Sequence, residues 1–237
     1  MSSTSDIPWT DATWQPCHGC TPISAGCRNC YAARMANRQQ AMGTKGYENG
    51  FAVTLRPDRL DEPLRWRKPR MVLVCSMGDL FHDEVPTSYI RRVFQTMRDA
   101  PQHTFQILTK RAERLAALAD DLPWPDHIWA GVTVEHSGPK HRIECLRRVP
   151  ARVRFLSLEP LLGPIPRLSL EGIHWAICGG ESGPGFRPMH PDWARDIRDQ
   201  CAQAGVPFFF KQYSAFRPKQ LGHLLDGVEH REYPEAR

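Results

Sequence analysis

The sequence lacks the segments that would carry a chain into or through a membrane. No apolar run approaches the roughly 20 residues that a membrane-spanning helix needs, and the polar start, Met1–Asp6, has neither the basic nor the apolar region of a secretory signal. Internal repeats, low-complexity tracts and compositional boundaries are missing as well. These absences predict a cytoplasmic chain, where thiols stay reduced and metal ligation is favoured over disulfides.

The sequence also lacks a strong excess of one charge. It has 31 Lys and Arg against 26 Asp and Glu, which gives a net charge of +5 over 237 residues. That balance permits an anionic partner, although domains that grip duplex DNA are often more basic. The hydrophobic content of 41% is ordinary for a globular protein, and single-domain α/β barrels often reach this length.

Short apolar runs alternate with helical patterns along the chain. Several runs are almost continuously apolar, as expected of parallel strands covered on both faces. The predicted strands are Asp11–Trp14, Phe51–Leu55, Met71–Cys75, Thr104–Leu108, Ile128–Val134, Val153–Leu158, His174–Cys178 and Val206–Lys211. The predicted helices are Asn29–Met42, Asp58–Trp66, Thr87–Asp99, Arg111–Asp120, Pro139–Arg148 and Pro191–Ala204, and Leu161–Gly172 is a predicted loop.

Repeated β-α units of this size predict an α/β fold, a partial or complete parallel (β/α) barrel. We expect one barrel domain over residues 1–214, with the group of cysteines at 17–31 on a loop after the first strand. The remainder, 215–237, has no strong period, and we expect it to be a C-terminal extension that is partly disordered.

What the sequence does have is a dense group of cysteines. Four of the eight form two C-x-x-C pairs, Cys17 with Cys20 and Cys27 with Cys30, and six residues separate the pairs. Such thiolates can bind zinc or an iron–sulfur cluster. A zinc ribbon usually places its pairs about 15–20 residues apart. The alternative uses only Cys20, Cys27 and Cys30 as ligands of a [4Fe–4S] cluster, which leaves one iron open.

Polar residues follow the predicted strands at the points where the strands end. Because active sites of parallel α/β folds form at the carboxyl ends of strands, we expect these residues to meet there. The candidates for binding a cofactor are Ser76, Asp79, Glu159, Gly179, Gly180, Glu181 and Ser182. Lys110 and Lys211 are the catalytic candidates, and with Arg111 they would meet an anionic substrate. Each group also has a purely structural interpretation. The glycines could form only a turn, the carboxylates could cap helices, and the lysines could extend into solvent.

The loop that ends in Cys27-Arg-Asn-Cys30-Tyr31 resembles the cysteine loop of the radical S-adenosylmethionine superfamily, whose usual spacing is C-x3-C-x2-C. The chain more closely resembles a phage-associated family of unknown function within or near that superfamily. The matching motifs include Trp9-Thr-Asp-Ala-Thr-Trp14, Ser76-Met-Gly-Asp79-Leu-Phe81, Glu159-Pro-Leu-Leu-Gly163 and Gly179-Gly-Glu181-Ser-Gly183-Pro. Leu108-Thr-Lys110 is also similar to the spore photoproduct lyase branch, which acts on DNA.

This resemblance implies a [4Fe–4S] cluster on Cys20, Cys27 and Cys30, with S-adenosylmethionine chelated at the fourth iron. An external electron donor would drive cleavage of the cofactor, and the resulting deoxyadenosyl radical would take a hydrogen from a nucleic acid base or nucleotide during its modification or repair. Cys17 could be a fourth ligand that closes the open iron. The alternative function is a non-catalytic zinc or iron–sulfur binding module that recognises nucleic acid. Arg65–Arg70 is either a second phosphate-binding stretch or a solvated helix end.

Overall fold

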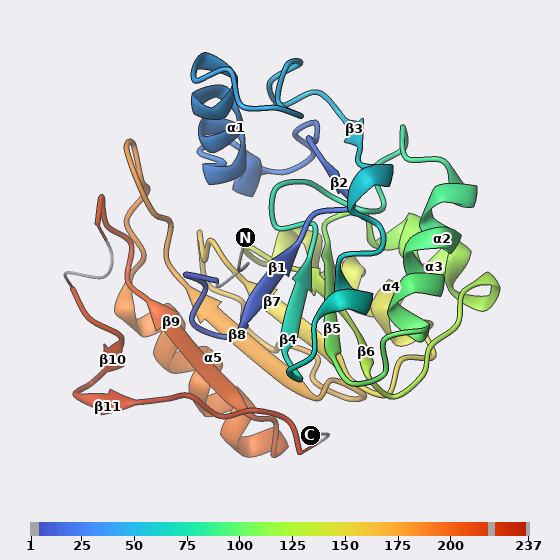
Figure 1. Cartoon of the computed structure of the whole chain (residues 1–237). Helices are drawn as coiled ribbons and strands as arrows, with labels where there is room; N and C mark the ends of the chain where they lie inside the picture. The colour runs from blue at the N-terminus through green and yellow to red at the C-terminus, as the bar shows by residue number, and fades with distance from the viewer. Residues whose placement is uncertain (1–4, 218–220, 236–237) are drawn as a thin grey trace.

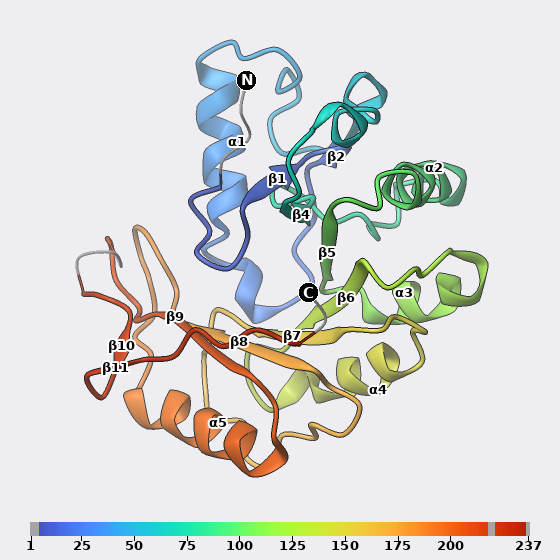
Figure 2. The ribbon, with the colours of Figure 1, turned by 60° about the horizontal axis from the view of Figure 1, so that its bottom comes forward.

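The computed structural model describes residues 5–217 and 221–235 and contains a parallel sheet curled into half a barrel (Figures 1 and 2). The seven strands are β1 (Ala12–Trp14), β4 (Met71–Val74), β5 (Thr104–Thr109), β6 (Ile128–Thr133), β7 (Arg154–Leu158), β8 (Trp175–Gly179) and β9 (Phe208–Gln212). They pair in that order, and every pairing is parallel. Spatial order follows chain order, as repeated crossovers of one hand require. The predicted partial barrel is confirmed.

Helices α2 to α5 cover one face of this sheet (Figure 2). They are α2 (Thr87–Arg98), α3 (Ala112–Leu118), α4 (His141–Arg147) and α5 (Pro191–Ala204), whereas α1 (Tyr31–Ala41) stands apart beyond the end of β1 (Figure 1). Short 3₁₀ helices are η1 (Ala25–Cys27), η2 (Pro57–Arg59), η3 (Pro63–Arg65), η4 (Ala119–Asp121) and η5 (Gly138–Lys140). No helix within the described ranges is long and apolar enough to cross a membrane.

Two predicted elements are wrong, and both lie before β4. The predicted helix Asp58–Trp66 is instead the two 3₁₀ turns η2 and η3, because Pro63 has no N–H to continue a helical ladder and starts a new turn. The predicted strand Phe51–Leu55 contributes only β3 (Thr54–Leu55), which pairs antiparallel with β2 (Cys17–His18) outside the main sheet. This small pairing fixes the point where the group of cysteines begins.

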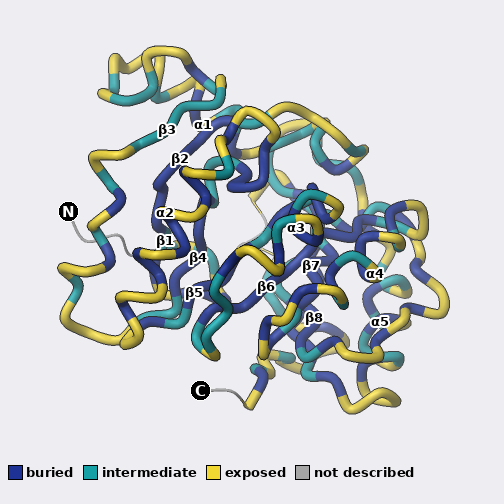
Figure 3. Tube along the Cα trace, turned by 90° about the vertical axis from the view of Figure 1, so that its right-hand side faces the viewer, coloured by how far each residue is buried: buried dark blue, intermediate teal, exposed yellow. Residues whose placement is uncertain are grey.

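Aromatic side chains fill the interior of the half-barrel near the amino-terminal ends of its strands. The buried cluster consists of Trp9, Leu73, Trp129, Val153, Phe155, Trp175, Ile177 and Phe209. The Tyr233 ring of the C-terminal tail packs 5.2 Å from that of Trp175, measured between ring centroids. Figure 3 shows how the strands are buried while exposed residues collect in the loops. The interior is therefore closed at that end, and open space is left at the carboxyl ends of the strands.

Part of the C-terminal extension packs beside β9. It forms a hairpin of β10 (Leu224–Leu225) and β11 (Val228–Glu229) and then returns beside β9. The Phe210 amide donates to the His230 carbonyl over 2.9 Å, and the Glu232 amide donates to Phe208 over 3.2 Å. Residues 218–220 and 236–237 lie outside the described residues, so the partial disorder expected of this tail stays a prediction.

Packing inside the half-barrel predicts that replacing Gly131 by alanine destabilises the fold more than replacing Gly163. A Cβ at Gly131 would lie 2.4 Å from Cζ of the wholly buried Phe155 ring, whereas a Cβ at Gly163 would meet only His136 Cβ at 3.5 Å. We expect Gly131→Ala to lower the free energy of unfolding by about 1–3 kcal/mol through overpacking, and Gly163→Ala to change it by less than about 0.5 kcal/mol. Urea denaturation measures both changes. Equal denaturation midpoints for the two variants would contradict the close packing of Gly131 against Phe155.

Candidate functional site

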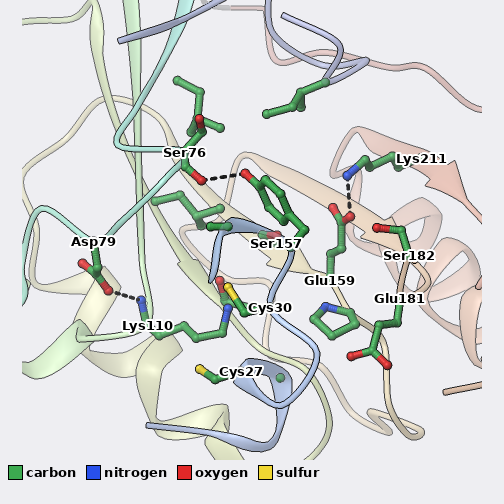
Figure 4. A pocket seen from close by; sticks show the side chains of 18 of the residues that line it. Cys27, Cys30, Ser76, Asp79, Lys110, Ser157, Glu159, Glu181, Ser182 and Lys211 are labelled. Atoms are coloured by element: carbon green, nitrogen blue, oxygen red, sulfur yellow. Dashed lines mark hydrogen bonds and ion pairs between the residues drawn. The ribbon is translucent and has the colours of Figure 1, made fainter. Parts of the chain in front are cut away.

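A cavity of about 670 Å³ lies at the carboxyl ends of the strands. It is lined by residues at or after the carboxyl ends of β4 to β9 and by residues of the segment 17–30, which we call the cysteine loop. Of the site residues predicted from the sequence, all but Gly179 line it: Cys20, Cys27, Cys30, Ser76, Asp79, Lys110, Glu159, Gly180, Glu181, Ser182 and Lys211. The structure therefore brings together residues spread over most of the chain, and Figure 4 shows the cavity from close by with ten of its lining residues labelled.

Glycine shapes the start of the cysteine loop. Gly19 has φ +86°, a left-handed value that favours glycine, and a Cβ there would lie 2.2 Å from the Ala52 carbonyl oxygen. Its amide donates to the Met77 carbonyl over 2.9 Å, which ties the loop to the end of β4. The loop then passes through η1 and reaches Cys30, the residue that caps α1. A side chain at Gly19 would push the loop away from the cavity.

Cys17 points away from the cavity into the core. Its Sγ lies 3.3 Å from Sγ of Cys75, and both thiols are free and buried. Cys75 adopts φ +59°, an uncommon and strained value for a residue with a side chain, and burial raises the pKa of its thiol well above the ordinary value. Cys20, Cys27 and Cys30 are free as well but only half-buried. The four loop cysteines are thus divided into three at the cavity and one in the core.

Arg111 holds the loop at Cys20. Its guanidinium Nη1 lies 3.3 Å from Cys20 Sγ and 3.2 Å from Asp79 Oδ2, and Nη2 donates to the Thr21 carbonyl over 3.2 Å. Asp79 in turn accepts from the Thr109 hydroxyl over 2.7 Å. Burial and the Asp79 charge raise the pKa of the Cys20 thiol, although Arg111 opposes them. Asp79, a predicted cofactor residue, is thus a partner of Arg111.

Glu135 holds the loop at Cys27. The Ser24 hydroxyl donates to its carboxylate over 2.5 Å and also lies 3.6 Å from Cys27 Sγ. A Cβ on Gly26 would meet the same carboxylate oxygen at 2.5 Å, so the loop backbone lies directly against Glu135. Arg142 donates to the second carboxylate oxygen over 3.1 Å. The Glu135 side chain is 0% exposed, so this carboxylate is committed to the loop and to Arg142.

The surroundings of Cys27 lower the pKa of its thiol. Burial favours the neutral thiol, but hydrogen bonds from the Ile23 backbone and the Ser24 hydroxyl, together with the Lys110 charge, bring the pKa below its ordinary value. Figure 4 shows the Lys110 side chain extending toward the cysteines, and its Nζ lies 3.9 Å from the Glu135 carboxylate. This surrounding favours the thiolate, which is the form that binds metals.

Glu181 holds the loop next to Cys30. Its carboxylate accepts from Asn29 Nδ2 over 2.9 Å and from the Arg187 backbone amide over 2.8 Å, and the Arg187 guanidinium pairs with both oxygens. Burial alone would raise the pKa of Glu181, but the Arg187 and Asn29 hydrogen bonds lower it. Its oxygens are therefore already engaged, although the sequence pointed to Glu181 as a cofactor ligand.

The remaining predicted residues lie around the cavity wall. Lys211 Nζ pairs with the Glu159 carboxylate, so their charges offset each other. A Cβ at Gly180 would lie 2.2 Å from the Ser214 amide, so packing requires glycine there. The Ser76 carbonyl accepts from the Tyr31 hydroxyl over 2.6 Å, and the Ser182 carbonyl accepts from Arg34 over 2.9 Å. Both contacts join α1 to strand ends.

Sequence reasoning missed the residues that hold the loop. Ser24, Glu135, Arg142 and Arg187 were not among the predicted site residues, and Arg111 was given to an anionic substrate. Glu135 did carry a usable signal, because it follows β6 as the other candidates follow their strands. The partners of these residues lie far away in sequence, 111 residues for Ser24 and Glu135 and 162 residues for Arg187 and Ala25, and no local pattern gives such pairs.

Comparisons with known proteins agree with the fold. A protein family described as "Protein of unknown function (DUF5131)" matches residues 4–234. No curated protein matches the chain. A solved structure of spore photoproduct lyase complexed with dinucleoside spore photoproduct is 12% identical, with a TM-score of 0.53 over 84% of this chain. The alignment spans 63% of that protein's length, and at this identity it shows a shared fold alone.

The buried position of Glu135 predicts a large effect of its removal. Glu135→Ala leaves Arg142 without its buried partner, and we expect a loss of about 3–5 kcal/mol in the free energy of unfolding. The matched control is Glu113→Ala, whose carboxylate pairs with His141 but is 64% exposed, and there we expect a loss below about 1 kcal/mol. Urea denaturation compares the two, and equal losses would show that Glu135 is not an anchor.

Proposed function

The chain belongs to the DUF5131 family of proteins of unknown function, and we propose that it is a radical S-adenosylmethionine-like [4Fe–4S] enzyme that acts on a nucleotide or nucleic acid. One observation carries the proposal. Three half-buried free thiols of one loop, Cys20, Cys27 and Cys30, line a strand-end cavity, while Cys17 is turned into the core beside Cys75. Three protein thiolates would leave one iron of a [4Fe–4S] cluster open toward the cavity.

The donor set fits a cluster better than a single metal ion. A structural zinc needs four ligands around one ion, whereas three of the loop thiols, Cys20, Cys27 and Cys30, line the cavity and the fourth, Cys17, lies in the core beside Cys75. A [4Fe–4S] cluster is held by cysteine thiolates, each of which would bind a different iron. Lys110 and Arg111 add positive charge beside Cys27 and Cys20, which suits an anionic thiolate-bound cluster.

The cavity suits a small-molecule cofactor beside the loop. Its volume of about 670 Å³ lies within the roughly 300–1,000 Å³ typical of ligand sites. Ser76, Ser157 and Glu159 would bind polar groups of S-adenosylmethionine, while Asp79 and Glu181 would stay with their arginines and keep the loop in place. When bound, the cluster and cofactor would supply radical chemistry for removal of a hydrogen atom from the substrate. The protein's part is to orient both molecules and keep water away.

A nucleotide or nucleic acid is the substrate class that we favour. Lys110 lines the cavity, has a partly exposed side chain and could meet a phosphate. The solved neighbour was complexed with a dinucleoside, and the net charge of +5 is compatible with an anionic substrate. The other predicted basic stretch, Arg65–Arg70, directly precedes β4 and so lies at the opposite ends of the strands from the cavity. It has no part in this proposal.

Iron loading tests the cysteine assignment. Anaerobically reconstituted protein should hold about four irons per chain, the content of one [4Fe–4S] centre. Cys20→Ala, Cys27→Ala and Cys30→Ala should each lose the cluster, because each removes the ligand of one iron, whereas Cys17→Ala should keep it. Iron and zinc analysis with an electronic spectrum measures this. Dithionite-reduced protein supplied with S-adenosylmethionine should then release 5′-deoxyadenosine and methionine.

Stoichiometric zinc, or a loss of iron in Cys17→Ala equal to that of the other three variants, would contradict the assignment. It would favour the alternative of a non-catalytic module. If the protein holds the cluster and is reduced but does not cleave S-adenosylmethionine, the proposed enzymatic function is wrong.

Oligonucleotide binding tests the substrate class. Single strands should bind more tightly than duplex, because a base in duplex must first be flipped out to reach the cavity. Affinity should fall with salt, and Lys110→Ala should reduce the slope of log K against log salt by about 0.7, the value for one phosphate contact on a single strand. Lys68→Ala removes an equal charge before β4 and should leave the slope unchanged. Fluorescence anisotropy at several salt concentrations measures this, and salt-independent binding would argue against a nucleic acid.

A further inference from the structure

Helix α1 exposes an apolar stripe that normally would be buried. Tyr31, Met35, Arg38 and Met42 follow one another at i, i+4, i+7 and i+11, so they lie on one face of the helix. Met35 and Met42 are 41% and 64% exposed, and Tyr31, which is 47% exposed, lines the cavity. The buried residues of α1, Ala32 and Ala36, lie on another face, and Tyr31 and Arg34 join the helix to the strand ends through hydrogen bonds to Ser76 and Ser182. We call these four residues the α1 stripe.

The surroundings of the α1 stripe are positively charged. Residues 12–47 contain no Asp or Glu but include Arg28, Arg34, Arg38 and Lys45. Arg34 donates to backbone carbonyls, whereas Arg28, Arg38 and Lys45 are exposed and form no ion pair with any residue in the described ranges. Charged side chains that have no partner at the edge of an apolar stripe suit a partner with an acidic surface.

The α1 stripe begins at the cysteine loop. Cys30 is the residue before α1, and Tyr31 both starts the stripe and lines the cavity. In Figures 1 and 2 the helix stands at the periphery of the molecule, away from the sheet. A partner bound along this face would therefore lie next to the three cysteines.

We propose that the α1 stripe is the docking site of an acidic protein that donates one electron to the cluster. The inference rests on the proposed function, which requires such a donor. In the step, the reduced donor loses one electron and the oxidised cluster gains it, and no covalent bond forms or breaks. Tyrosine, methionine and arginine are enriched at the centres of protein interfaces, and methionine adapts its shape to different partners.

A nucleic acid fits this face less well than a protein does. Binding of single strands depends on aromatic side chains that stack on successive bases. The α1 stripe has one aromatic residue, Tyr31, whose hydroxyl already donates to the Ser76 carbonyl. Two of its other three members are thioethers rather than rings. Met35 and Met42 therefore favour a protein surface, and polynucleotide binding becomes an outcome of the test.

The test compares a protein reductant with a chemical one. The probe is a plant-type [2Fe–2S] ferredoxin with a strongly acidic surface, a one-electron carrier with a potential of about −400 mV. Stopped-flow absorbance follows reduction of the reconstituted full-length protein by reduced ferredoxin or by dithionite. Arg38→Glu should slow reduction by ferredoxin by about tenfold or more at low salt, because it removes electrostatic steering, and Met42→Glu should slow it too.

Reduction by dithionite should be unchanged in both variants, because a small molecule does not need the α1 stripe. The matched control is Lys68→Glu, which makes the same change of charge before β4 and should leave both rates unchanged.

Equal ferredoxin rates in Arg38→Glu and the unmodified protein would overturn the inference, as would equal slowing with both reductants. Loss of single-stranded DNA binding in Arg38→Glu, with an unchanged ferredoxin rate, would assign the face to nucleic acid instead. A protein that takes up no cluster would instead refute the proposed function, and this inference with it. Iron analysis separates that outcome from a failure of docking alone.

Discussion

Three buried charged residues at strand ends hold the cysteine loop, and the rest of the site depends on them. Arg111, Glu135 and Glu181 follow β5, β6 and β8, and each lies beside a different cysteine or its neighbour. Their partners of opposite charge are Asp79, Arg142 and Arg187. Because each charge has both a partner and a hydrogen bond to the loop, burial leaves no charge uncompensated. A loop with little regular structure is thereby fixed at three separate points.

This arrangement divides the polar residues into two groups. Asp79 and Glu181 position the loop, and Glu159 with Lys211 forms a pair in the cavity wall. The cavity residues that we propose meet a ligand are Ser76, Ser157, Glu159 and Lys110. The aromatic cluster closes the other end of the half-barrel. A site of this kind gets its precision from supporting contacts rather than from the groups that touch a ligand.

Strong local signals in the sequence predicted much of the fold. The bounds of α5 were correct because Pro191 starts the helix and Gly205, at φ +64°, ends it. The parallel strands were recognisable as continuous apolar runs, but Pro63 was overlooked as a helix breaker. The group of cysteines was visible from its spacing. That Cys17 would face Cys75, 58 residues away, could not be read from any local pattern, and neither could the anchoring role of Glu135.

The electron paramagnetic resonance spectrum of the dithionite-reduced protein, with and without S-adenosylmethionine, tests most directly whether three cysteines leave one iron open. A reduced [4Fe–4S] cluster with an open iron should give a signal whose g values shift when the cofactor is added, because the cofactor becomes a ligand of that iron. Cys17→Ala should show the same shift, since Cys17 lies in the core. A cluster signal that the cofactor leaves unchanged, or that depends on Cys17, would contradict the account.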